Sequence, residues 1–176
     1  KAGFNFGTGT AVPYYQDIAF KVNIPIKKNQ LTFFGIGGKS NIDFIHNKND
    51  TANFFSNGQQ DLRYRTNMGV AGMSYLFFIN KSAYIKTTLA TTYTGVKALI
   101  DSISPSETAI PFYRDNSTLS RAIAHIVFNK KFSAKQNISL GIIAQQLGFN
   151  FNDSVLTNGI AFRPLRELKG SSGLHQ

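Results

Sequence analysis

The sequence predicts an all-β fold, built as a segment of an antiparallel transmembrane β-barrel with about six to seven strands. Apolar and polar residues alternate over long stretches, which is the period-two pattern of a half-buried strand. Tight turns at 27–30, 79–82 and 133–136 join three pairs of these stretches, and polar segments at 45–61, 99–116 and from 152 onward separate the pairs. Short connections at one end of the sheet and long connections at the other end are typical of membrane barrels. We therefore expect short periplasmic turns and long extracellular loops.

The first two stretches form the clearest expected hairpin. In 14–25, the apolar residues Ile18, Phe20 and Val22 alternate with Asp17 and Lys21. The proline at the end of this stretch terminates the strand, because proline cannot donate to a central ladder. The partner stretch also separates apolar from polar residues, with Thr32, Phe34, Ile36, Ile42 and Phe44 opposite Lys39, Asn41 and Asp43.

The second hairpin repeats the pattern. In 62–76, one side carries Leu62, Tyr64, Met68, Val70 and Leu76, and the other carries Arg63, Arg65 and Asn67. Its partner sets Ile85, Leu89 and Tyr93 against Lys86 and several threonines. The third hairpin, 118–128 with 137–151, is less regular because Arg121 and His125 fall on its bulkier face. We expect the apolar side to contact lipid, including Ile18, Phe20, Val22, Leu62, Met68 and Val70.

Composition narrows the possible functions. The chain has 176 residues, no cysteine and a net charge of +10, so disulfides and thiolate metal sites are excluded. No apolar run is long enough for a transmembrane helix. Basic residues gather at the expected short turns and acidic residues in the expected long loops. The charges therefore lie at the two ends of the expected sheet and do not form a basic patch on one face. Because no nucleic-acid-binding signature is present either, we expect no nucleic-acid partner.

One glycine-rich motif is similar to a phosphate-binding loop. Residues 35–40 read GIGGKS, but the Walker pattern needs a glycine five residues before the Gly-Lys-Ser triplet, where this chain has Phe33. The strand alternation continues after the motif, so no helix N-terminus is available to hold a phosphate. These glycines indicate a strand that bends or meets close-packed neighbours.

The sequence contains no recognisable catalytic or metal-binding set. His46, His125 and His175 are too scattered to be ligands of one metal, and no Gly-x-Ser-x-Gly nucleophile motif occurs. Asp17 and Asp43 could face each other across the first hairpin, and we interpret them as lumen charges and not as an acid–base pair. We expect no enzymatic activity, no cofactor and no metal.

Three segments resemble the barrel region of TonB-dependent outer-membrane receptors. They are 6–17 (FGTGTAVPYYQD), 20–25 (FKVNIP) and 34–40 (FGIGGKS). The resemblance is closest to the large receptors with a carboxypeptidase-regulatory-like domain ahead of the plug. It is strongest over 1–44, and after residue 44 it consists of the repeated order of strand, short turn, strand and long loop. Such receptors have about 22 strands around a folded plug. The resemblance implies that residues 1–176 are an internal fragment of the barrel, without plug, coupling box or C-terminal closing strand.

The resemblance also implies a function and partners. Such a receptor imports a scarce nutrient, for example a metal chelate, vitamin, glycan or peptide, across the outer membrane of a Gram-negative bacterium. The implied partners are outer-membrane lipid, the remainder of the barrel and plug, a periplasmic energy-coupling protein that acts through the plug, and a surface lipoprotein.

Candidate contact residues follow from the expected faces and loops. Residues of the polar face would line the lumen or touch the plug: Asp17, Lys21, Lys39, Arg63, Arg65 and Lys86. Aromatic residues of the long loops would lie on the substrate side: Phe54, Phe55, Phe112 and Tyr113. The same aromatic residues could instead only pack the loops together.

Two other interpretations remain open. A closed eight-stranded outer-membrane barrel with a structural or adhesive role fits the chain length, but needs the weaker stretches 1–8 and 155–163 to be strands. A soluble barrel that binds a small hydrophobic ligand would show the same alternation. It would stay in solution without detergent.

Overall fold

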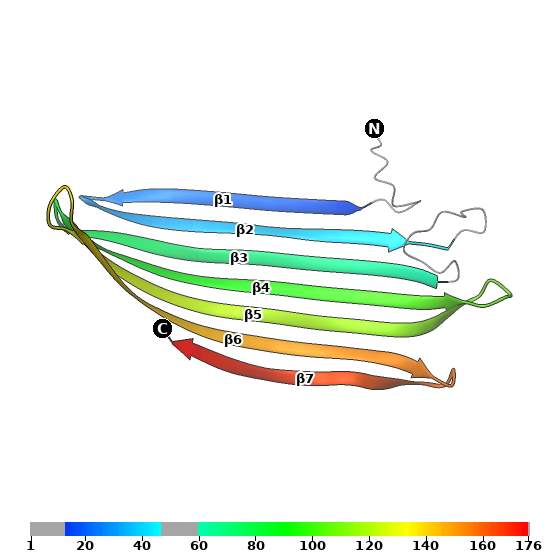
Figure 1. Ribbon diagram of the computed structural model, residues 1–176. Helices are drawn as coiled ribbons and strands as arrows, with labels where there is room; N and C mark the ends of the chain where they lie inside the picture. The colour runs from blue at the N-terminus through cyan, green and yellow to red at the C-terminus, as the bar shows by residue number, and fades with distance from the viewer. Residues whose placement is uncertain (1–12, 47–59, 176) are drawn as a thin grey trace, which may run out of the picture.

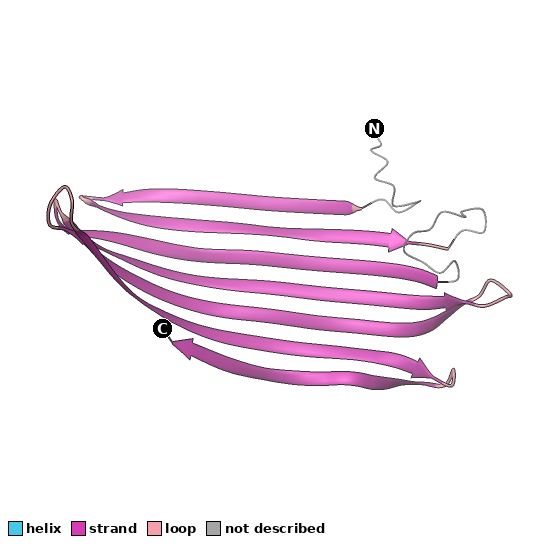
Figure 2. Ribbon diagram, in the orientation of Figure 1, coloured by secondary structure: helices cyan, strands magenta, loops and turns pink. Residues whose placement is uncertain are grey.

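The computed structural model describes residues 13–46 and 60–175, which form one antiparallel sheet (Figure 1). Seven strands lie side by side in chain order, with β1 and β7 at the two edges. Their bounds are β1 Tyr14–Ile26, β2 Asn29–Phe44, β3 Gln60–Asn80, β4 Ala83–Ile103, β5 Ala109–Lys131, β6 Asn137–Thr157 and β7 Ala161–His175. The all-β, antiparallel expectation is confirmed, in the form of an open sheet (Figure 2).

The connections correct part of the sequence prediction. The three expected tight turns are present, at 27–28, 81–82 and 132–136. The expected loops at 99–116 and from 152 onward are mostly strand, since β4 and β5 are joined by 104–108 alone and β6 and β7 by 158–160. The prediction mistook polar strand for loop. Polar side chains are compatible with a long antiparallel ribbon, because the backbone groups bond to the neighbouring strand whatever the side chains are.

The β6–β7 turn shows why an additional strand forms. Asn158 and Gly159 have φ values of 53° and 68°, and the Ile160 N–H donates to the Thr157 carbonyl at 3.2 Å. Positive φ at both central residues is the condition for the tightest hairpin turns, which favour Asn-Gly. The chain therefore reverses there, and β7 includes residues 161–175, a stretch that was predicted to belong to the polar segment from 152 onward.

Strand pairing fixes which side chains share a face of the sheet. Phe20 is paired with Gly35, and the ladder continues through Ala71, Thr91 and Ala122. Directly paired residues lie on the same side of a sheet, and neighbours along a strand lie on opposite sides. We call the two sides the Phe20 face and the Lys21 face, after the adjacent residues of β1.

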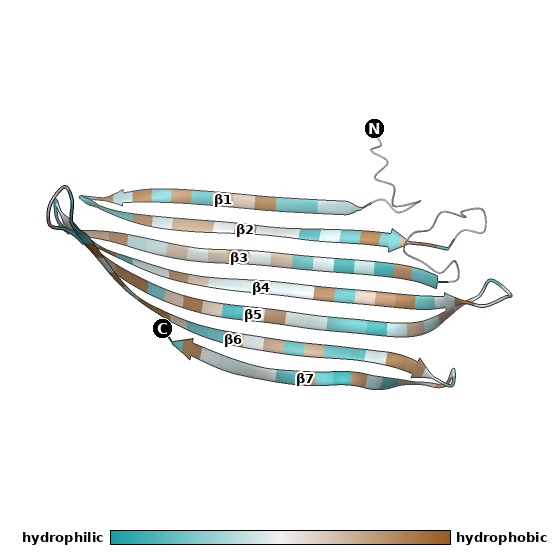
Figure 3. Ribbon diagram, viewed as in Figure 1, coloured by the Kyte–Doolittle hydropathy of each residue, from teal (hydrophilic) through white to brown (hydrophobic). Residues whose placement is uncertain are grey.

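The Phe20 face carries an apolar band near the short turns. It comprises Ile18, Phe20, Val22, Ile24, Ile26, Leu31, Phe33, Met73, Phe77, Ile85, Leu89, Ile126, Phe128, Leu140 and Ile142. Toward the opposite end, the same face becomes polar and charged, with Lys39, Arg63, Arg65, Lys97 and Arg114. Apolar and polar segments accordingly alternate along the strands in Figure 3.

The Lys21 face has the reverse distribution. Beside the short turns it carries Asn23, Thr32, Ser74, Thr88 and His125, which are linked by direct pairing. Farther along the strands it becomes apolar, with Ile36, Val70, Met68, Leu119 and Phe149. The apolar side of the sheet thus changes from one face to the other partway along the strands.

The sheet is a single layer within the described ranges. Ala83 and Ala98 are the buried hydrophobic residues there, whereas Ile18 is 72% exposed and Ile142 is 68% exposed. A soluble domain would cover such a surface with a second layer. A helix long and apolar enough to cross a membrane is not found in these ranges.

Candidate functional site

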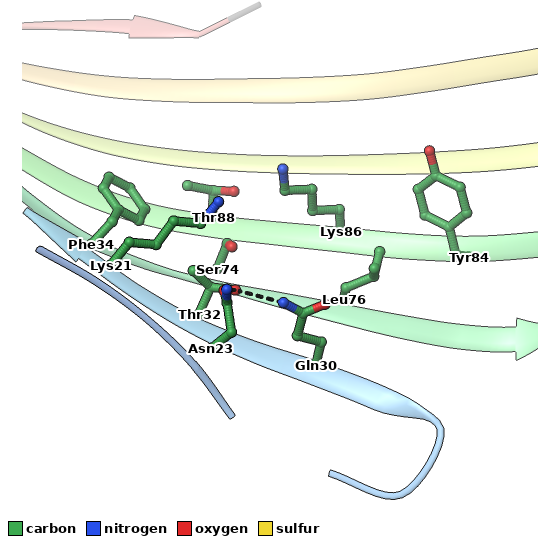
Figure 4. Close-up of a pocket in the computed structure, with 10 residues that line it drawn as sticks. All are labelled: Lys21, Asn23, Gln30, Thr32, Phe34, Ser74, Leu76, Tyr84, Lys86 and Thr88. Carbon is green, nitrogen blue, oxygen red and sulfur yellow. Dashed lines mark hydrogen bonds between the residues drawn. The ribbon is translucent and has the colours of Figure 1, made fainter. Parts of the chain in front are cut away.

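A cavity of about 690 Å³ lies on the Lys21 face, opposite the apolar band (Figure 4). Strands β1 to β4 supply its lining, because direct pairing places their polar residues side by side. The lining residues are Lys21, Asn23, Gln30, Thr32, Phe34, Ser74, Leu76, Tyr84, Lys86 and Thr88. Most of these side chains are hydrogen-bonding groups, so the cavity is suited to water and polar solutes.

Hydrogen bonds order one side of this cavity. The Thr32 hydroxyl donates to Asn23 Oδ1 at 2.9 Å, and Gln30 Nε2 donates to Thr32 Oγ1 at 3.4 Å. Lys21 and Lys86 are exposed at its margin. Next to it on the same face, Thr88 is paired with His125 on β5. The surface is therefore polar and positively charged, and it can bind or guide an anionic or hydrogen-bonding group.

The cavity lacks the parts of a hydrolytic or metal site. No group of three or more His, Cys, Asp or Glu side chains that could hold a metal occurs among residues 13–46 and 60–175. The lysines and hydroxyls of the lining have no carboxylate or imidazole within the lining set to act as a base.

The six candidate lumen residues do not share one face. Asp17, Lys21 and Lys86 lie on the Lys21 face, and the Lys39, Arg63 and Arg65 side chains lie on the Phe20 face. The expected grouping is wrong because it assigned the apolar side of each strand separately. Strand pairing places Leu62, Met68 and Val70 on the Lys21 face, in the part of the sheet where that face is apolar. They therefore lie on the opposite side of the sheet from Phe20.

The four aromatic loop candidates are also divided. Phe112 and Tyr113 belong to strand β5 and not to a loop, whereas Phe54 and Phe55 lie outside the described residues. The Tyr113 hydroxyl donates to Asp153 Oδ2 at 3.1 Å. Burial and the hydrogen bond to this carboxylate raise the pKa of Tyr113 above its ordinary value. Tyr113 therefore links β5 to β6 at the end of the sheet.

An ion-pair cluster that the sequence did not predict lies at the same end, on the Phe20 face. Asp101 accepts from Arg63 Nη1 at 2.8 Å and from Arg114 Nη2 at 2.7 Å, and its side chain is 8% exposed. Arg65 donates to both carboxylate oxygens of Asp43 and holds the pKa of Asp43 below its ordinary value. These pairs join β2 to β5 beyond the apolar band. Only the strand register, which sequence patterns leave open, brings the partners together.

Comparisons with protein-family models, with characterised proteins and with solved structures give no match for this chain.

The Asp101 cluster gives a testable prediction. Asp101→Asn keeps the shape of the side chain but removes the charge that pairs with two guanidinium groups, so we expect this end of β3–β5 to be destabilised by roughly 1 to 3 kcal/mol. Amide hydrogen exchange of residues 97–116 should then be faster. Glu167→Gln is the matched control, because Glu167 forms no ion pair within the described ranges. Equal exchange in both variants would contradict a role of the cluster in stability.

Proposed function

We propose that this chain forms part of the wall of an outer-membrane β-barrel, in an energy-coupled receptor that imports a scarce nutrient. In this proposal the Phe20 face contacts lipid and the Lys21 face lines the interior. The apolar band is the observation that carries the proposal. It extends over six of the seven strands without any covering layer in the described ranges.

The dimensions of the band fit a membrane. In β1 it spans residues 18–26, and nine residues at about 3.3 Å each extend about 30 Å along the strand. With the roughly 45° tilt of barrel strands, this corresponds to a height of about 21 Å, close to the apolar belt of about 25 Å in outer-membrane barrels. The strands of 21 to 23 residues in β3–β6 then continue well past the membrane at the opposite end.

The opposite face supports the same orientation. In the part of the sheet that carries the apolar band, the Lys21 face presents lysine, asparagine, threonine, serine and histidine side chains. Lipid would leave these groups without hydrogen-bond partners, and a water-filled lumen or a plug surface would satisfy them. Tyr93 lies at one margin of the band, where an interfacial aromatic girdle would form.

The two edges of the sheet favour a larger barrel over the closed eight-stranded alternative. β1 pairs only with β2, and β7 pairs only with β6, within the described residues. An unpaired strand edge cannot be satisfied in hydrocarbon. We therefore propose that further strands pair with β1 and β7 and close the barrel.

Transport is the part of the proposal that depends on the resemblance to TonB-dependent receptors. In such a receptor the Lys21-face cavity would face the plug and the permeating nutrient, and a periplasmic energy-coupling protein would act through the plug. The cavity suits this role because most of its lining side chains can form hydrogen bonds with a polar solute. The chain would then have no enzymatic activity of its own.

The orientation predicts opposite effects of arginine at two adjacent positions. Met73 lies in the apolar band, and Ser74 lies on the Lys21 face, where it lines the cavity. Met73→Arg should cost about 2 to 4 kcal/mol because the charge would enter lipid, whereas Ser74→Arg should cost little. Chemical unfolding of the full-length protein in lipid vesicles measures both costs. A larger cost at Ser74 than at Met73 would reverse the proposed orientation.

Transport predicts a change in the growth medium. Wild-type cells should deplete one solute that cells lacking the gene leave behind, and a protonophore should stop this depletion by removing the energy source. Mass spectrometry of spent media compares the strains without knowledge of the substrate. Identical media in limiting growth conditions would contradict import and favour a structural role.

A further inference from the structure

Two adjoining hollows on the Phe20 face form a compartment that the proposed transport does not use. The first has a volume of about 310 Å³ and lies beyond the apolar band, toward the 104–108 end of the sheet. The second has a volume of about 480 Å³ and reaches into the band. Lys39, Asn67 and Tyr93 line both, so the two hollows adjoin.

The first hollow is cationic. Lys39, Arg65 and Lys97 contribute three positive charges, and the amides Asn41, Asn67 and Asn116 add hydrogen-bonding groups. Asp43 neutralises Arg65 through the ion pair described above. Lys39 and Lys97 are exposed and form no ion pair within the described ranges. The hollow therefore keeps a net charge of about +2, which favours an anionic group such as a phosphate.

Gly95 gives this hollow its depth. A Cβ atom at Gly95 would lie 3.0 Å from the Tyr93 hydroxyl and would also meet the Asn67 amide. Any other residue would thus displace the side chains that line the hollow. The Tyr93 hydroxyl lies over Gly95, at the junction of the two hollows.

The second hollow is mainly apolar. Ile18 and Tyr93 form its sides, and Gly37 and Gly69, which are directly paired, form its floor. Gly37 belongs to the GIGGKS motif. The motif thus contributes to both hollows, through the floor at Gly37 and the cation at Lys39.

We propose that these hollows together bind a membrane lipid with a phosphate-bearing headgroup. This inference rests on the proposed orientation, in which the Phe20 face contacts lipid. The headgroup phosphate would lie between Lys39 and Lys97, and an acyl chain would lie along Gly37 and Gly69. Charge complementarity supports this occupant, since cations immediately outside an apolar band attract anionic headgroups. The long lysine side chains can follow the headgroup at the interface.

The test uses the full-length protein in lipid nanodiscs that contain phosphatidylglycerol as the anionic probe and phosphatidylcholine as the neutral one. Native mass spectrometry after release counts the lipids that remain bound. We expect the protein to retain phosphatidylglycerol preferentially. The Lys39→Gln/Lys97→Gln double variant should retain it roughly thirtyfold less, since each of the two basic residues contributes about 1 kcal/mol near an anionic surface and about 1.4 kcal/mol corresponds to a factor of ten.

Two further variants separate this site from general electrostatics. Gly69→Leu should also lower retention, because it fills the apolar hollow without changing charge. Its Cβ would lie 3.8 Å from the Ile36 carbonyl oxygen, an ordinary contact that the backbone tolerates. Lys21→Gln/Lys86→Gln removes the same charge from the opposite face and should leave retention unchanged.

The outcomes distinguish the two proposals. Insertion into nanodiscs without preference for phosphatidylglycerol, or a preference that survives in the Lys39→Gln/Lys97→Gln variant, would overturn the lipid site but not the barrel. Failure of the protein to enter nanodiscs would overturn the membrane orientation, and the lipid site with it.

Discussion

Backbone pairing between neighbouring strands is the constraint on which this structure depends. Each ladder of paired residues passes across the sheet, so the side of one residue in β1 determines the side of its counterparts as far as β6 and β7. A shift of one residue in any ladder would move every side chain beyond it to the opposite face. The apolar band, the polar cavity and the ion-pair cluster all require one shared register.

The exchange of polarity between the two faces is the main consequence of this register. Near the short turns the Phe20 face is apolar and the Lys21 face is polar, and at the other end the assignment is reversed. In the proposed orientation, a barrel wall that extends into water beyond the bilayer would lose the apolar character of the Phe20 face in this way. The outer surface must be apolar only within the bilayer, and outside it the cations of Lys39, Arg65 and Lys97 can face water and headgroups.

The sequence predicted most of the local structure. Period-two alternation predicted the strands, and the tight turns at 27–28 and 81–82 followed from the breaks in that pattern. The Asn158-Gly159 turn carried an equally strong signal that the prediction did not use. The prediction of a loop at 99–116 was wrong, because most of the polar residues there lie in paired strands beyond the apolar band.

The candidate site was less accessible from sequence, for a physical reason. Alternation assigns two faces to each strand but does not say which face of one strand continues which face of the next. The prediction therefore assigned Arg63 to the lumen side and Leu62 to the lipid side from local hydropathy alone. The observed strand register places each residue on the face opposite to that prediction. Asp101 lies far from Arg63 in sequence, and only the β3–β4 ladder brings them within 2.8 Å.

The most direct test of this account is a spin-label scan of β3 from Gln60 to Asn80, with the full-length protein in a lipid bilayer. Power saturation with oxygen reports lipid contact, and a water-soluble nickel chelate reports contact with water. The account predicts oxygen maxima at Ala71, Met73 and Tyr75, and chelate access at Arg63 and Arg65 on the same face. Oxygen maxima at Gly72 and Ser74 instead, or an absence of periodicity, would contradict it.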